Sequence, residues 1–272
     1  MEYAECRIEY KSRADIFKLY PLGDIHAGVK YCSETAIRAK VKKIAADPFA
    51  RWVGMGDYAD LVTPGDKRWD VAGIADWVKK QDIAESQRKW VVELFSPIRS
   101  QCLGLLEGNH EISIRIHNNN DFYMHICEDL GVTPLGYSCF LDMVFIRLPG
   151  RHSTLFRGHL EHGSGAAQSE GGQMNRLKKA MLGFEGDFFA MGHLHTKKID
   201  ASETILTVAG TTIKEKVRCA AITGSWYKSY EQGVRASYAE QKGYKPSSIG
   251  CPVFLFEPDK GIVDVQGGRE RQ

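Results

Sequence analysis

The sequence lacks the long hydrophobic runs and the paired cysteines that would place it in several common protein classes. No stretch of its 272 residues reaches the eighteen or so consecutive apolar residues of a membrane helix. The first residues alternate acidic with apolar side chains, so the apolar core of a secretory signal is missing. The seven cysteines are an odd number without any Cys-x-x-Cys pair, which argues against a disulfide framework and against a zinc knuckle. We therefore expect a cytoplasmic protein that does not contact membranes.

An excess of charge of one sign, internal repeats and low-complexity segments are also missing. The 36 basic and 34 acidic residues leave a formal net charge of +2, so a nucleic acid would have to be bound by local basic patches. No linker rich in proline or serine divides the chain. The 43% hydrophobic content is that of an ordinary globular protein. We expect one domain over residues 1–272, with its core at about 16–265.

Short apolar runs that end abruptly in glycine and a polar cluster recur along the chain. They end at Gly23, Gly56, Gly108 and Gly192, and they are typical of buried strands. Segments with helical periodicity separate them, and this alternation indicates an α/β fold. The predicted helices run from the N-cap Ser33 to about residue 45, near 71–95, over 121–130 with Gly131 as the stop, and over 172–182. The chain after residue 200 is rich in β-prone residues, with a closing hairpin at 253–265.

Side chains that bind metals follow these strand ends. A single Gly-Asp or Gly-His pair is a weak signal, because both occur in ordinary turns. A lone histidine is more often a solvated or hydrogen-bonded imidazole than a ligand. Five clusters together are a stronger signal, because ligands of an open α/β sheet gather in the crevice at the carboxyl ends of its strands. The clusters contain Asp24, His26, Asp57, Asp60, Asn109, His110, His162, His193 and His195.

The composition of these clusters predicts a pair of divalent cations. Aspartate, asparagine and histidine without cysteine suit Mn²⁺, Fe²⁺ or Zn²⁺ better than copper(I) or an iron–sulfur cluster. The candidate ligands are too many for one tetrahedral ion with an open position, but they serve two ions if Asp57 bridges. Two ions about 3.5–4 Å apart stabilise the attacking and leaving oxygens of an in-line displacement, which predicts hydrolytic phosphoryl chemistry. The seven candidates are Asp24, His26, Asp57, Asn109, His162, His193 and His195.

With these residues in this order, the sequence resembles the calcineurin-like metallophosphoesterases. It looks most like the phage and bacterial members described as DNA-repair-exonuclease-like phosphoesterases. The resemblance spans residues of about 16–265 and implies a four-layer α-β-β-α sandwich of two mixed sheets flanked by helices. The motifs that carry it are Asp24-Ile25-His26, Gly56-Asp57-Tyr58-Ala59-Asp60, Gly108-Asn109-His110-Glu111, His162-Gly163 and Gly192-His193-Leu194-His195.

The resemblance also implies a role for each site residue. His110 would face the substrate as a general acid or as a cationic stabiliser of the transition state. Asp60 would lie behind it and keep the imidazole protonated, because a neighbouring carboxylate raises the pKa of a histidine. Glu111 would support the loop. Two divalent ions, Mn²⁺ first and Fe, Zn or Ni as alternatives, would be held by Asp24, His26, Asp57 and His195, and by Asp57, Asn109, His162 and His193.

The fourth motif offers two histidines, and five other cations are candidate substrate contacts. His159 and His162 would point to opposite faces of a strand, so only one of them can reach the metals. His162 stands at a Gly-Ser-Gly break where a strand would end, so we predict it as the ligand and His159 as a buried imidazole, with the reverse as the alternative. Arg115, five residues past His110, is the candidate for phosphate binding. The Lys178-Lys179 and Lys197-Lys198 pairs are expected to be solvated faces, with phosphate contact as the alternative.

Three classes of function follow from these residues. The first is a phosphoesterase that uses metal-activated water without a covalent intermediate, acting on a phosphodiester or phosphomonoester, with DNA exonuclease or phosphodiesterase activity as the leading case. Asp60 is followed by Leu61, whereas the protein-phosphatase branch of the family that the sequence resembles has arginine there. A phosphoprotein substrate is therefore disfavoured. A small-molecule nucleotidase or cyclic-nucleotide phosphodiesterase is the alternative. A catalytically silent protein-binding scaffold is disfavoured because every ligand and His110 are present.

Overall fold

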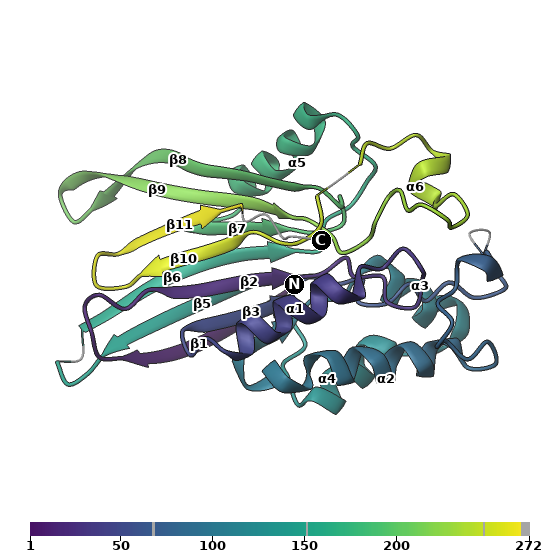
Figure 1. The fold of residues 1–272 in the computed structure, drawn as a ribbon. Helices are drawn as coiled ribbons and strands as arrows, with labels where there is room; N and C mark the ends of the chain where they lie inside the picture. The colour runs from purple at the N-terminus through teal and green to yellow at the C-terminus, as the bar shows by residue number, and fades with distance from the viewer. Residues whose placement is uncertain (67–68, 151, 247, 268–272) are drawn as a thin grey trace.

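A computed structural model describes residues 1–66, 69–150, 152–246 and 248–267 of the chain. In it, two mixed β-sheets stack face to face and helices cover their outer faces (Figure 1). One sheet has six strands in the order β1-β5-β6-β7-β9-β8. These strands are β1 (Glu2–Tyr10), β5 (Ser138–Arg147), β6 (His152–Glu161), β7 (Phe188–Met191), β9 (Thr212–Thr223) and β8 (Lys197–Ala209).

The second sheet has five strands in the order β11-β10-β2-β3-β4. Its members β2, β3 and β4 run parallel to one another, while β10 is antiparallel to both β2 and β11. The predicted closing hairpin is therefore confirmed as the β10–β11 pair. The strands are β11 (Ile262–Gln266), β10 (Val253–Glu257), β2 (Phe17–Leu22), β3 (Ala50–Gly54) and β4 (Cys102–Leu105).

The main core lies between the two sheets and is built from alternating positions of the strands. Leu19 and Val53 of the five-stranded sheet face Leu141 and Phe188 of the six-stranded sheet, and all four are fully buried. Trp52, the neighbour of Val53, points the other way because successive side chains of a strand alternate between its faces. Its indole ring packs against helix residues on the outer face, and its Nε1 donates a hydrogen bond of 2.8 Å to a backbone carbonyl.

Helices cover the outer faces of both sheets, which confirms the predicted four-layer α-β-β-α arrangement. Helices α1 (Glu34–Ala45), α2 (Ile83–Phe95) and α4 (Phe122–Leu130) share a core with the outer face of the five-stranded sheet, and α5 (Glu170–Gly183) packs on the six-stranded sheet. Helix α1 buries an apolar stripe that includes Ile37, as its periodicity predicts. Gly131 ends α4 in the left-handed conformation, as expected. The remaining helices are α3 (Asn109–Asn118), α6 (Tyr238–Gln241) and the 3₁₀ helices η1 (Val71–Gly73) and η2 (Ser96–Gln101).

The helix expected near 71–95 forms only in its second half. The Asp70 side chain accepts a hydrogen bond from the backbone of Ala72, which closes the short turn η1 instead of a longer helix. The residues after this turn pack as a small cluster of their own around Ile74 and Val78, and α2 begins at Ile83. None of the helices in the described part of the chain is long and apolar enough to span a membrane.

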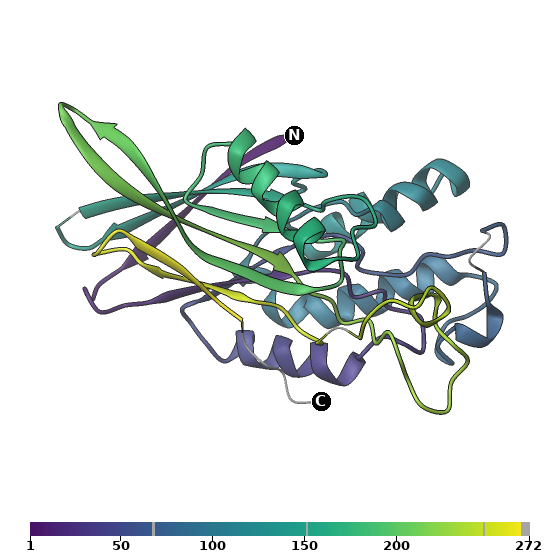
Figure 2. The same cartoon turned by 90° about the horizontal axis from the view of Figure 1, so that it is seen from above.

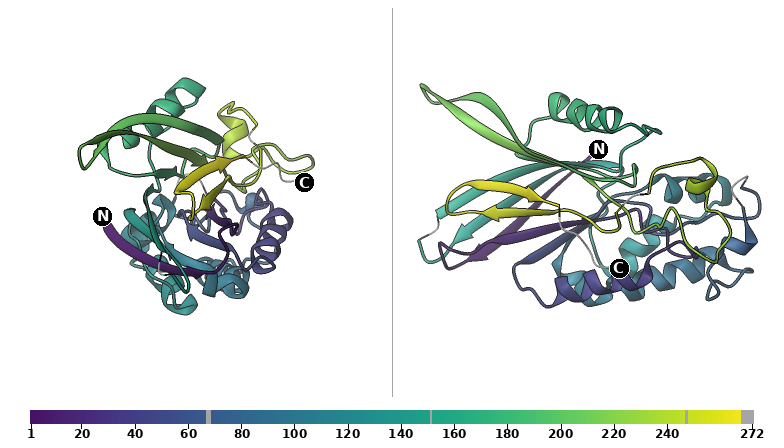
Figure 3. Two further views of the ribbon diagram at one scale, coloured as in Figure 1. Left: turned by 90° about the vertical axis from the view of Figure 1, so that its left-hand side faces the viewer. Right: turned by 45° about the horizontal axis from the view of Figure 1, so that its top comes forward.

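The β8–β9 hairpin is longer than the strands beside it. Its far end projects beyond the rest of the two sheets, as Figures 2 and 3 show. Apolar side chains near its tip, including Leu206 and Ile213, are largely exposed. The end of β9 that lies inside the sheet is fully buried, and it pairs with β7.

Candidate metal centre

Five loops that follow strands meet at one rim of the sandwich. Asp24 follows β2, Asp57 follows β3 and Asn109 opens α3 just after β4. In the other sheet, His162 comes directly after β6 and His193 comes two residues after β7. Because β2, β3 and β4 are parallel and β6 and β7 are parallel, the carboxyl ends of each set lie at the same edge. The convergence that the strand-end pattern predicts is therefore present in the structure.

The backbone of these loops is strained where it presents the candidate ligand side chains. In the described residues, positive φ angles at non-glycine positions are concentrated in this rim. Such angles are uncommon outside glycine, cost about 1–3 kcal/mol each, and persist where the surrounding structure enforces them, often at functional sites. The rim residues concerned are Asp24 (49°), His26 (50°), Asp57 (52°), His193 (67°) and His195 (51°).

The first predicted ligand set forms a compact group. The candidate ligand atoms of Asp24, His26, Asp57 and His195 all lie within 4.8 Å of one another. The Nε2 atoms of His26 and His195 are 2.9 Å apart. The Asp24 Oδ1 lies 3.4 Å from Nε2 of His195, and the Asp57 Oδ2 lies 3.9 Å from Nε2 of His26.

The second predicted set shares Asp57 with the first. The candidate ligand atoms of Asp57, His162 and His193 also lie within 4.8 Å of one another. The His162 Nε2 lies 3.4 Å from the Asp57 carboxylate and 3.0 Å from the Asn109 side chain. The other ring nitrogen of His162, Nδ1, is 2.7 Å from the carbonyl oxygen of Met55, to which it would donate. This hydrogen bond leaves the Nε2 lone pair directed into the group, as a metal ligand requires.

The donor atoms fit a pair of cations. Ligands at right angles around an ion with bonds of about 2.1 Å are about 3.0 Å apart, close to the separation of the His26 and His195 nitrogens. The Asp24 Oδ1 is buried and has no hydrogen-bond partner in the described residues, which is costly unless a cation satisfies it. In the second group, the amide of Asn109 lies between His162 and His193 and would present its oxygen to a metal.

The protonation of the protein groups also suits cations. Burial raises the pKa of Asp57, but the imidazoles of His162 and His110 outweigh this and hold that pKa well below its usual range. Burial and the neighbouring His162 lower the pKa of His193, which favours the neutral imidazole that binds metals. Burial also lowers the pKa of His162, but the Asp57 carboxylate overrides it and raises the pKa to about 10 in the metal-free protein. A cation bound there would replace this proton.

His110 lies beside the first group, at the start of α3. Its ring nitrogen Nδ1 is hydrogen-bonded to the backbone carbonyl of Asp60, while the Asp60 carboxylate lies 3.5 Å from Nδ1 of His26. The sequence predicts that the carboxylate of Asp60 is the group behind His110. In the structure, a carboxylate oxygen of Asp60 lies within 4.8 Å of a ring nitrogen of both His26 and His110. The hydrogen bond that orients His110, however, is made to the backbone carbonyl of Asp60.

Glu111 joins two of the loops. Its carboxylate is fully buried and accepts backbone hydrogen bonds of 2.9 Å from Gly108, Asp57 and Tyr58. Burial, together with the nearby Asp57 carboxylate, raises the pKa of Glu111 to about 7. A Cβ atom at position 108 would lie 2.3 Å from the backbone nitrogen of Asp57, so this contact requires glycine. The loop that carries Gly108 and Glu111 therefore holds the loop that carries Asp57 in place.

Three residues that sequence reasoning missed also support the rim. The Gln87 side chain accepts a hydrogen bond from the backbone of Leu61 at 3.0 Å, although Gln87 lies on α2. The Ser225 hydroxyl donates to the carbonyl of Asp24 at 2.8 Å. The ring of Tyr227 lies 5.6 Å from His26 and 5.8 Å from His195. No local pattern could have identified these residues, because each acts on a loop far away in the sequence.

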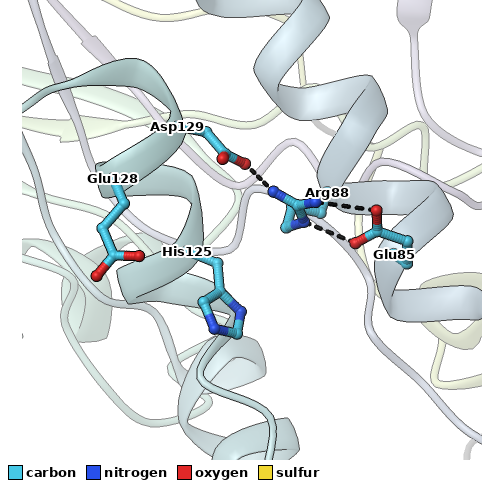
Figure 4. A pocket seen from close by; sticks show the side chains of 5 residues that line it. All are labelled: Glu85, Arg88, His125, Glu128 and Asp129. Carbon is cyan, nitrogen blue, oxygen red and sulfur yellow. Dashed lines mark hydrogen bonds and ion pairs between the residues drawn. The ribbon is translucent and has the colours of Figure 1, made fainter.

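The remaining sequence candidates lie outside the two groups. His159 is buried on the outer face of the six-stranded sheet, where its ring stacks on Phe184 at 3.9 Å. Arg115 forms an ion pair of 3.1 Å with Glu107 on the surface, so its binding to a phosphate stays a prediction. A small hollow between α2 and α4 contains none of the predicted site residues, and its Arg88 is paired with Glu85 and Asp129 (Figure 4).

The arrangement of the fourth motif predicts which histidine variant loses metal. We expect His162→Ala to retain one of two metal equivalents, because it removes a ligand from the second group only. We expect His159→Phe, which preserves the stack on Phe184, to retain both. Emission spectroscopy of the purified variants measures this directly. Loss of an equivalent from the His159 variant, with the His162 variant unaffected, would reverse the assignment.

Comparisons with known proteins give likenesses to solved structures. No family model matches the chain, and no curated protein matches its sequence. Among solved structures, a metallophosphoesterase from Sphaerobacter thermophilus aligns with a TM-score of 0.40 and 12% sequence identity. The alignment covers 94% of this chain and 89% of that one.

Proposed function

We propose that this protein is a two-metal phosphoesterase of the calcineurin-like type. The observation that carries the proposal is the pair of ligand groups that share the buried Asp57. Two divalent cations held there would act as Lewis acids on a phosphoryl group and would lower the pKa of a bound water. Mn²⁺ is our first choice, and Fe, Zn or Ni are alternatives with the same donor preferences.

The protein groups around the two ligand groups would bind and orient the ester. Asp57 stays ionised and occupies the centre, and the imidazoles of His26 and His193 stay neutral because burial lowers their pKa values. His110 is oriented by its hydrogen bond to the carbonyl of Asp60, and in this proposal its other ring nitrogen donates a proton to the leaving oxygen. In this proposal Asp60 acts on His110 mainly through its main chain.

The substrate class we propose is a nucleic acid or nucleotide phosphoester, with DNA exonuclease or phosphodiesterase activity as the leading case. The support for it is the resemblance of the five motifs to the DNA-repair-exonuclease-like phosphoesterases. Leu61, which is buried, occupies the position where the protein-phosphatase branch has arginine, and this argues against a phosphoprotein.

A panel of substrates tests the proposal. The protein is stripped of metal, reconstituted in turn with Mn²⁺, Fe²⁺, Zn²⁺ and Ni²⁺, and assayed on aryl mono- and diesters, cyclic nucleotides, and single- and double-stranded DNA. We expect hydrolysis that depends on two bound equivalents of metal. A protein that binds two equivalents and hydrolyses none of these esters would contradict the proposal, and so would full activity with a single equivalent.

His110→Gln is expected to retain both metals and to lose activity selectively. Glutamine cannot donate a proton to an alkoxide, so turnover of esters with poor leaving groups should fall about 10²–10⁴-fold, while p-nitrophenyl esters should be affected less. The ratio of kcat for alkyl and aryl esters measures this effect. The control is His117→Gln, an exposed position on the same helix α3. An equal loss for both classes of ester would rule out His110 as the proton donor.

A further inference from the structure

A cavity of about 560 Å³ lies on the outer face of the six-stranded sheet, apart from the two metal-ligand groups. It is an open cavity bordered by α5, by the segment after His162 and by the ends of β6 and β7, and Figure 2 shows α5 lying over this sheet. Its volume is within the range of about 300–1,000 Å³ that is typical of small-molecule sites. The residues that give the cavity its chemistry are Glu161, Ser164, Arg176, Lys179, Phe184 and Met191.

Two cations border the cavity from the same face of α5. Arg176 and Lys179 are three residues apart, so their side chains are neighbours on the helix surface. Neither has an ion-pair partner in the described part of the chain, whereas Lys178 between them turns away and pairs with Asp200 at 3.0 Å. The sequence predicts a solvated face for the Lys178-Lys179 pair, but the two lysines differ in their surroundings. Two unneutralised cations beside a cavity favour an anionic ligand.

The guanidinium of Arg176 is held in a fixed position. Its Nη1 donates a hydrogen bond of 2.6 Å to the carbonyl oxygen of Ser164. Gly165 has a φ of +85°, and a Cβ atom there would lie 2.2 Å from the Nη2 atom of Arg176. Glycine suits this backbone conformation and leaves room for the close approach of the arginine. A guanidinium fixed in this way loses little entropy when it binds an anion.

Apolar and aromatic side chains also line the cavity. Phe184 stacks on His159, with 3.9 Å between ring centroids and an angle of 9° between the rings, and it contacts Phe140 edge-on. Burial lowers the pKa of His159 to about 4, so the ring that supports Phe184 is neutral at physiological pH. Met191 also lines the cavity, and the carboxylate of Glu161 offers a hydrogen-bond acceptor. A planar ring with an amino or hydroxyl group fits these surroundings.

We propose that this cavity binds a phosphate ester that carries a planar ring and has the size of a nucleoside monophosphate. The phosphate lies against Arg176 and Lys179, and the ring lies towards Phe184 and Met191. The site goes beyond the proposed reaction, because none of the residues that line it belongs to the two ligand groups. Glu161 and Met191 precede His162 and Gly192, so an occupied cavity would adjoin the loops that carry His162 and His193.

Calorimetric titration of the full-length Asp57→Asn protein with AMP tests the site without turnover at the metal centre. We expect saturable binding that Arg176→Gln/Lys179→Gln weakens at least about tenfold, because two charge-assisted contacts are lost. The matched control, Lys178→Gln/Lys198→Gln, removes the same charge from side chains that pair with Asp200 and Glu170, and it should bind AMP as before. Equal affinities in the two double variants would overturn the proposal, as would failure to bind AMP at millimolar concentrations.

The two halves of the ligand are tested separately. Inorganic phosphate and adenosine should each bind more weakly than AMP, since each fills only one part of the cavity. Phe184→Ala should remove the preference for AMP over ribose 5-phosphate while leaving the affinity for ribose 5-phosphate unchanged. An unchanged preference would exclude the aromatic subsite. Because the titration measures binding in a variant without turnover, its result does not depend on whether the protein hydrolyses phosphoesters.

Discussion

Replacing Asp57 by asparagine is expected to lower metal-dependent phosphoester hydrolysis by at least about 10³-fold, equivalent to about 4 kcal/mol, while the protein stays folded. Asp57 is the member shared by both ligand groups, and asparagine offers a single neutral oxygen in place of a bridging carboxylate. The other carboxylate oxygen, Oδ1, accepts a hydrogen bond of 2.9 Å from the backbone of His110. An asparagine oxygen can keep this bond, so the loss should be chemical and not structural.

The measurement combines the rate of bis-p-nitrophenyl phosphate hydrolysis with metal content and thermal unfolding. The control is Asp76→Asn, which removes the same charge from an exposed side chain. A folded Asp57 variant that binds two metal equivalents and turns over at the wild-type rate would show that Asp57 does not bridge. A folded variant with one equivalent and little activity is the expected result.

The position of the site could be predicted because it depends on strand polarity. Asp24 and Asp57 follow two adjacent parallel strands, and such ends meet at one edge of a sheet whatever the rest of the fold. Alternation along β6 puts His159 and His162 on opposite faces, and the Gly-Ser-Gly break after the strand is the reason for predicting His162 as the ligand. Both inferences need only local information: where a strand ends and which face a residue occupies.

The supporting contacts could not be predicted because they depend on residues far apart in the chain. The main-chain carbonyl of Asp60 orients His110, and a backbone acceptor leaves no trace in the residue type. The sequence analysis also did not predict the edge strand β1. Most of its residues are exposed, and its pairing partner β5 lies more than a hundred residues away in the chain.

Glu111→Gln is expected to destabilise the fold by about 2–4 kcal/mol and to weaken metal binding about 10–100-fold. Three backbone N–H groups converge on the two carboxylate oxygens: Oε2 accepts from Gly108 and Asp57, and Oε1 accepts from Tyr58. Glutamine has one oxygen, so its amide hydrogens must face at least one of these buried donors. The donor left without an acceptor cannot reach water, and the Asp57 loop that it anchors would shift relative to the other ligands.

Denaturant unfolding and metal titration of the same variant separate this positioning role from catalysis. Glu107→Gln is the control, since Glu107 lies on the same loop, keeps an ion pair with Arg115 and touches none of the three amides in the described contacts. If Glu111 only supported the local turn, stability would fall but metal affinity would not, because the ligands are contributed by other side chains. A fall in both shows that the shape of the Asp57 loop sets the affinity. An Asp57 loop held independently of Glu111 would instead leave both the unfolding midpoint and the metal affinity of the variant at wild-type values.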